Sequence, residues 1–141
     1  MTATSHAVTG ATIATIVRQP LLALPLAFMS HFICDMVPHF GIDSKFGSKS
    51  MYWRLGIDGA VAICIAVFLI LSGVTNPWFL ALAGFVAMSP DLMWLYHGLK
   101  NHSPADYGAI SRTHSNIQLF EKPVGIIIEI FWIAACLIII L

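Results

Sequence analysis

Histidine and aspartate residues occur at a spacing that could bind a metal ion. His31 and Asp35 are four residues apart, so a helix would place both side chains on one face. Imidazole and carboxylate groups at this spacing are used by metal-binding helices, and the combination suits zinc, manganese or iron(II). His39 follows two turns further along, just after Pro38, and could turn back toward the same point or point elsewhere.

Each of these residues also has a simpler structural interpretation. His31 and Asp35 could hydrogen-bond to each other and lock two helices together. Asp58 could pair with Arg54, four residues before it on the same helix. Asp91 could cap a broken helix end by accepting from free amides. Against these alternatives, a carboxylate in an apolar helix is costly unless it is paired or coordinated, and a divalent cation would supply that compensation.

The composition indicates which elements must position these side chains. Hydrophobic residues make up 58% of the 141 residues and charged residues only 10%. Soluble domains are nearer half apolar and a quarter charged. The mean hydropathy is +0.84. The formal net charge is zero, so nucleic acid is not an expected partner. We expect one integral membrane domain over residues 1–141, with membrane lipid as its surroundings.

The apolar segments predict an all-α fold, a membrane bundle of about four to five transmembrane or half-spanning helices. Each of the clearest segments is close to the length that a bilayer requires. The segment at 7–38 allows either a hairpin that turns at Arg18-Gln19-Pro20 or one long kinked helix. The expected helices cover about 7–18, 21–38, 54–72, 77–98 and 123–141, with polar loops at 40–54 and 98–122.

The distribution of basic residues predicts the topology. With the hairpin, both polar loops lie on the same side as the N-terminus, and six of the seven basic residues share that side; Arg18 is opposite. The positive-inside rule makes the shared side cytoplasmic, in the plasma (inner) membrane. All the ionisable residues considered above then lie at one membrane face. A single long helix would instead put His6 across the membrane from the others.

Four short motifs carry a family resemblance. They are Ser5-His6-Ala7-Val8-Thr9-Gly10, Ser30-His31-Phe32-Ile33-Cys34-Asp35 with Pro38-His39, Ser89-Pro90-Asp91-Leu92 and Arg112-Thr113-His114-Ser115. Together they resemble the membrane-bound metal-dependent hydrolases, an inner-membrane family that includes a LexA-regulated member. The chain departs from the family in two ways. Its Ser-His-x-x-x-Asp motif comes second rather than last, and Asp91 is not followed by the second acid of an Asp-x-Asp-His sequence.

The resemblance and the residue pattern together lead to one main hypothesis. The chain is expected to be a metal-dependent hydrolase at the cytoplasmic interface, acting on an ester or phosphoester of a lipid-like substrate. A divalent ion, zinc or manganese, would activate a water molecule. Asp58 could take the proton, and Arg112 could hold a phosphate oxygen. The expected metal ligands are His6, His31, Asp35, His39, Asp91 and His114.

Two other classes of protein could use the same residues. A membrane scaffold or partner-binding protein would hold them as a structural metal site or a hydrogen-bonded cluster. A structural zinc site is closed by four protein ligands, whereas a catalytic one keeps a position open for water. The large number of candidate ligands favours catalysis. An ion or proton transporter would place its acids at the bilayer midplane, whereas here the acids gather at one end of the expected helices.

Overall fold

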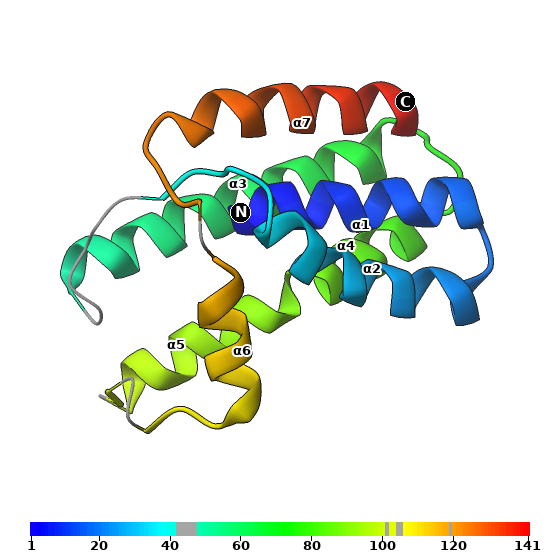
Figure 1. The fold of residues 1–141 in the computed structure, drawn as a ribbon. Coiled ribbons are helices and arrows are strands. Elements are labelled where there is room, and N and C mark those ends of the chain that lie inside the picture. The colour runs from blue at the N-terminus through cyan, green and yellow to red at the C-terminus, as the bar shows by residue number, and fades with distance from the viewer. Residues whose placement is uncertain (42–47, 101, 104–105, 119) are drawn as a thin grey trace.

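The computed structural model describes residues 1–41, 48–100, 102–103, 106–118 and 120–141, so residues 42–47 of the first polar loop lie outside the described part. Apart from one isolated β-bridge, every regular element in these ranges is helical (Figure 1). The elements are α1 (Ala3–Val17), α2 (Pro20–Asp35), α3 (Lys49–Leu71), α4 (Pro77–Met88), a 3-10 turn η1 (Ser89–Asp91), α5 (Leu92–Leu99), α6 (Ala109–Ile117) and α7 (Gly125–Ile140).

The N-terminal segment folds as a helical hairpin rather than as one long kinked helix. Helix α1 ends where Arg18 adopts the left-handed conformation, with φ of 55°. The side chain of Gln19 then accepts a hydrogen bond from the amide of Leu22 at 2.9 Å and caps α2. Pro20 occupies the first turn of α2, where its missing N–H costs nothing. As a result α1 and α2 lie side by side and antiparallel (Figure 1).

Helices α1 and α4 pack closely because small residues line their contact. A Cβ atom on Gly10 would lie 2.3 Å from the carbonyl oxygen of Ala83, and one on Gly84 would lie 2.8 Å from that of Ala7. Small side chains let helix backbones approach closely in membrane bundles, where packing replaces the hydrophobic effect between helices. This contact fixes the position of the start of α1 against the end of α4.

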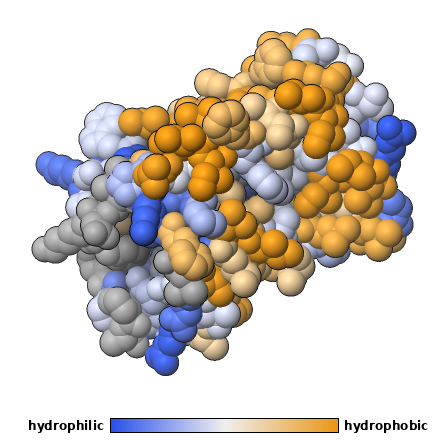
Figure 2. All heavy atoms as spheres, turned by 45° about the horizontal axis from the view of Figure 1, so that its top comes forward, coloured by the Kyte–Doolittle hydropathy of each residue, from blue (hydrophilic) through white to orange (hydrophobic). Residues whose placement is uncertain are grey.

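The exterior of the bundle is strongly apolar. Two helical stretches of 23 residues, Lys49–Leu71 and Pro77–Leu99, are long and apolar enough to cross a membrane, while α2 and α7 are apolar but shorter. Figure 2 shows apolar side chains over the middle and right of the molecule, with hydrophilic ones mainly at its left end. Large apolar side chains such as Leu21 and Ile138 are about four-fifths exposed (81% and 80%). Such a surface suits contact with lipid.

The second long stretch is interrupted just past its middle. Helix α4 stops at Met88, the segment Ser89–Asp91 forms a 3-10 turn, and α5 resumes at Leu92. Pro90 lies inside this turn, where its ring removes a backbone donor and disfavours regular α-helix. The helix is therefore interrupted at Pro90 by a short tightened turn, which places Asp91 at the junction of two helices.

Candidate metal centre

Five side chains from four elements meet at one end of the bundle. His6 comes from the first turns of α1, and His31 and Asp35 come from the last turns of α2. Asp91 comes from η1 and His114 from α6. They form two groups that share His31 and whose potential ligand atoms lie within 4.8 Å of one another. We call these five residues the His/Asp cluster.

The tighter of the two groups joins α2 to α6. Nε2 of His114 lies 2.7 Å from Oδ2 of Asp35 and 3.0 Å from Nε2 of His31. Nε2 of His31 lies 3.3 Å from the same carboxylate oxygen. All three side chains are fully buried.

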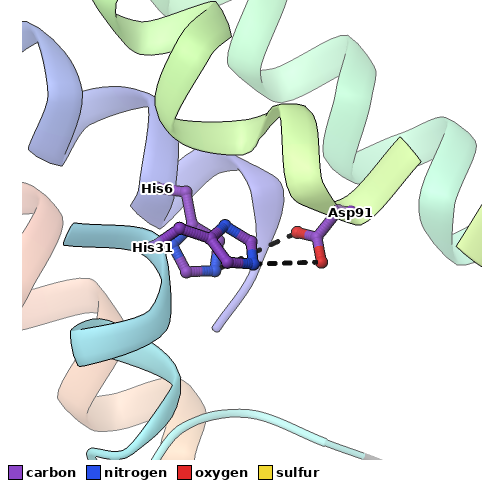
Figure 3. Close-up of side chains that lie close together, drawn as sticks. All are labelled: His6, His31 and Asp91. Atoms are coloured by element: carbon purple, nitrogen blue, oxygen red, sulfur yellow. Dashed lines mark ion pairs between the residues drawn. The ribbon is translucent and has the colours of Figure 1, made fainter. Parts of the chain in front are cut away.

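The wider group adds residues from α1 and η1. The rings of His6 and His31 stack with their centroids 3.9 Å apart, and both turn Nε2 toward the carboxylate of Asp91 (Figure 3). The distances are 4.0 Å from His6 and 3.7 Å from His31. Nε2 of His6 also lies 3.1 Å from Oδ1 of Asp35. The side chain of Asp91 is 17% exposed, so the cluster is less enclosed on this side.

A hydrogen bond to a backbone carbonyl determines which ring nitrogen of His31 faces the cluster. Its Nδ1 lies 2.9 Å from the carbonyl oxygen of Ala87, near the end of α4. Because a carbonyl oxygen only accepts hydrogen bonds, Nδ1 must carry the proton and donate it. In the neutral ring the lone pair is then on Nε2, which faces the other cluster residues. Metal-binding histidines are commonly oriented by a hydrogen bond of this kind.

The charges in the cluster also suit a divalent cation. Asp35 is fully buried, and a buried carboxylate requires positive partners or hydrogen-bond donors. The amino group of Met1 contacts its Oδ1, and the amide of Gln118 lies 3.3 Å from its Oδ2. The amino group of Met1 balances the charge of Asp35, and Asp91 adds a second carboxyl group that could bind a cation.

The spacing of the donor atoms can be compared with that of a real site. Ligand atoms that bind one zinc ion at about 2.0–2.2 Å lie roughly 3.2–3.6 Å from one another. In the cluster His114 and Asp35 lie 2.7 Å apart and His6 and Asp91 lie 4.0 Å apart, and the donor atoms of each group are all within 4.8 Å of one another. The donor atoms therefore lie at spacings comparable with those of a metal site.

His39 occupies a different place from the other predicted ligands. Its side chain is fully buried, with Nδ1 2.7 Å from the carbonyl oxygen of Val37 and Nε2 3.6 Å from the carboxylate of Glu121. Its backbone pairs with the segment at 120–122. His39 thus holds the chain after α2 against the chain before α7, and the two groups of potential ligands do not include it.

Asp58, the predicted base, is a residue of α3, and its carboxylate contacts the start of α1. Its Oδ2 accepts from the amide of Ala3 at 2.6 Å, and its Oδ1 accepts from the amide and the hydroxyl of Thr4 at 3.1 and 2.6 Å. The first amides of a helix have no partner within the helix, and the helix dipole favours negative charge there. These contacts give Asp58 a helix-capping role.

Arg112, the predicted phosphate contact, lies on α6 two residues before His114. Its side chain is exposed, and its Nε donates to the carbonyl oxygen of Tyr107 at 2.8 Å. This contact holds the guanidinium against the turn that leads into α6. Arg112 is therefore close to His114 in the sequence, but its described hydrogen bond is to a backbone carbonyl and not to the cluster.

Glu129 has a role that sequence reasoning did not assign. It is 1% exposed and lies near the start of the apolar helix α7. Its carboxylate accepts from the amides of Thr2 and Phe40, at 3.0 and 2.8 Å, and from the hydroxyls of Thr2 and Ser5. A buried charge in such a helix is itself a signal that polar partners exist, but the sequence does not say which they are.

Comparisons with protein-family models, with curated proteins and with solved structures found no match.

Proposed function

We propose that this chain is a membrane-embedded, metal-dependent hydrolase whose site is the His/Asp cluster. The observation that carries the proposal is the convergence of three imidazole Nε2 atoms and two carboxylates from four separate elements. Zinc and manganese are the preferred ions, because both accept mixed nitrogen and oxygen ligands. The motif resemblance to the membrane-bound metal-dependent hydrolases implies the same activity and belongs to this proposal.

Two features favour a catalytic site over a closed structural one. The cluster offers five potential ligand side chains, and a structural zinc site needs four. Asp91 also lies at the longer distances, 3.7 and 4.0 Å from its histidine partners, and is partly exposed. A site with one looser, more accessible carboxylate leaves room for water and substrate on that side.

The chemistry can then be divided between the ion and the protein. A bound divalent ion lowers the pKa of a water molecule and polarises an ester or phosphoester oxygen. Asp91, rather than the helix-capping Asp58, is placed to accept the proton of the attacking water. The water oxygen bonds to the acyl carbon or phosphorus, the ester bond breaks, and the leaving oxygen takes the proton back from Asp91. The products are an acid and an alcohol.

The position of the site supports a lipid-like substrate. Asp91 lies 14 residues after Pro77 in the apolar stretch Pro77–Leu99, which corresponds to roughly 21 Å along a helix. The hydrocarbon core of a bilayer is about 30 Å thick, so the site would lie toward one interface, near lipid ester groups. The excess of basic residues on that side makes the cytoplasmic face of the plasma (inner) membrane the proposed location.

A hydrogen-bonded structural cluster is the second candidate function. It is favoured by the contacts that Asp35 already has with the Met1 amino group, His6, His114 and Gln118. In that case the chain would be a membrane scaffold or partner-binding protein.

Elemental analysis of the detergent-purified protein separates the two candidates. The wild type is compared with His114→Ala and Asp35→Ala, and with His102→Ala, which removes a histidine that lies outside the cluster and contacts His97. The hydrolase proposal expects about one transition-metal ion per chain in the wild type and His102→Ala, and its loss in both cluster variants. It also expects turnover of lipid esters or phosphoesters by the metal-loaded wild type. If the wild type takes up neither zinc nor manganese, the hydrolase proposal is wrong, and the membrane scaffold is the better account.

A further inference from the structure

An apolar groove runs between α1, α3 and α4. It has a volume of about 340 Å³ and is lined almost entirely by carbon atoms. Small residues form much of its wall, and larger apolar ones close its ends. The lining includes Ala7, Gly59, Ala62, Ala66, Leu80 and Met88.

The groove exists because α3 stands away from the other helices at its small residues. Gly59, Ala62, Ala66 and Leu69 follow a helical repeat of three and four, so they share one face of α3. A Cβ atom on Gly59 would meet nothing within 4 Å, whereas one on Gly10 in the α1–α4 contact would lie 2.3 Å from a backbone oxygen. Empty apolar volume forfeits dispersion contacts, so it favours an apolar occupant.

One end of the groove lies beside the His/Asp cluster. Ala7 directly follows His6 in α1, and Met88 is three residues before Asp91. From there the groove follows α3 to Leu69, a distance of roughly 15 Å along a helix. The groove therefore extends from the level of the cluster, whose chain neighbours line it, along the apolar part of α3.

We propose that this groove holds one acyl chain of the lipid whose ester or phosphoester is cleaved at the His/Asp cluster. The proposal rests on the hydrolase function proposed above and names the substrate as an acyl lipid. The position and lining of the groove favour a lipid chain. Its walls are apolar, and one end lies beside the neighbours of His6 and Asp91, where the ester group of a bound lipid would be cleaved.

Photo-crosslinking tests the occupant without requiring turnover. The probe is phosphatidylglycerol with a diazirine at the end of one acyl chain, mixed with the full chain in detergent micelles. Crosslinked residues are mapped by mass spectrometry. We expect adducts on the residues that line the groove. Adducts spread evenly over outward-facing side chains such as Leu21, or crosslinks between two copies of the chain, would overturn the proposal.

Two glycines of α3 provide a matched pair of variants. Gly59→Leu places a side chain in the groove, and Gly56→Leu adds the same side chain to the same helix outside the lining; a Cβ meets nothing within 4 Å at either position. We expect Gly59→Leu to reduce adducts in the groove at least fivefold and Gly56→Leu to leave them unchanged. Equal yields in the two variants would contradict the proposal.

A third variant and a separate metal measurement keep the two proposals distinguishable. Ala66→Phe blocks the deeper part of the groove, so KM should rise about tenfold for a long-chain ester and stay unchanged for a butyryl ester. Equal effects on both esters would contradict an acyl-chain site. Metal content is measured in the wild type and in every variant. A wild type that binds no metal would count against the hydrolase, whereas a metal-loaded wild type without adducts in the groove would count against the acyl-chain site alone.

Discussion

Nε2 of His31 lies 3.0 Å from Nε2 of His114, although 83 positions separate the two residues in the chain. The hydrogen bond from His31 Nδ1 to Ala87 leaves the lone pair of its neutral ring on Nε2. Two ring nitrogens at this separation can share a proton or bind the same ion. The contact also joins α6, which lies in a polar part of the sequence, to the apolar hairpin of α1 and α2.

The two cluster carboxylates should differ in their effect on metal affinity. Asp35 lies 2.7–3.3 Å from three histidine nitrogens, and Asp91 lies 3.7–4.0 Å from two. We expect Asp35→Asn to weaken zinc binding by about 100-fold or more and Asp91→Asn by about tenfold, on the scale known for perturbed metal sites. Competition with a chelating dye measures both affinities. The reverse order would show that Asp91 is the main ligand.

Replacing Asp91 should lower turnover more strongly than it lowers metal affinity. If Asp91 accepts the proton, Asp91→Asn reloaded with saturating zinc should lose at least a factor of about 100 in kcat, within the usual range for general acid–base groups. Rates are measured at zinc concentrations that saturate the variant. Full recovery of kcat on saturation would remove Asp91 from the proton transfer.

The close contact of α1 and α4 predicts a strong effect of a single methyl group. In Gly10→Ala the new Cβ would lie 2.3 Å from the carbonyl oxygen of Ala83, so the two backbones must separate. Overpacking of this kind costs about 1–3 kcal/mol. Gly56→Ala is the control, because its Cβ meets nothing within 4 Å. Thermal unfolding in detergent should show a lower midpoint for Gly10→Ala alone; equal midpoints would contradict the packing described.

Asp58 should contribute to stability through the start of α1. Removing its charge in Asp58→Asn weakens hydrogen bonds to Ala3 and Thr4, and bonds to charged groups contribute about 1.5–3 kcal/mol each. Thr4→Val removes one of the donors. A double-mutant cycle should give a combined loss smaller than the sum of the two single losses. Additive losses, or a loss of turnover without a loss of stability, would favour the catalytic role that the sequence suggested.

Replacing Glu129 should destabilise the protein more than the same replacement at Glu121, because only Glu129 is buried. Glu129 is 1% exposed and accepts from several donors of Thr2, Ser5 and Phe40. In Glu129→Gln the amide group would face donors, and disrupting a buried charged network costs about 3–5 kcal/mol. The side chain of Glu121 is 49% exposed, so Glu121→Gln should change stability little. Similar midpoints for both variants in thermal unfolding would contradict the network.

The parts of the cluster and of the fold that could be predicted from the sequence depend on residues close together in the chain. The interval between His31 and Asp35 is a property of one helix, and the turn at Arg18-Gln19-Pro20 follows from residues that end one helix and begin another. The all-helical fold follows from composition and apolar run lengths. The sequence predicted four to five transmembrane or half-spanning helices, and two of the described stretches are long enough to cross a membrane.

The spacing of residues in the sequence did not reveal the hydrogen-bond partners of isolated polar residues. Asp58 lies in the third turn of α3, a place equally suited to a base or a cap. Only the packing of α1 against α3 decides which amides its carboxylate contacts. His39 has the spacing of a ligand, but backbone pairing with residues 120–122 directs it to Glu121. Such contacts depend on long-range packing, which residue spacing does not encode.

The hydrogen bonds between Thr2 and Glu129 have a consequence for how the protein is made. The two residues are 127 positions apart, and the described helices between them are synthesised first, because translation starts at the N-terminus. Until α7 emerges from the ribosome, the first amides of α1 lack one of their two carboxylate partners. The end of the bundle that carries His6 is therefore finished late in biogenesis, after the other side chains of the cluster have already been translated.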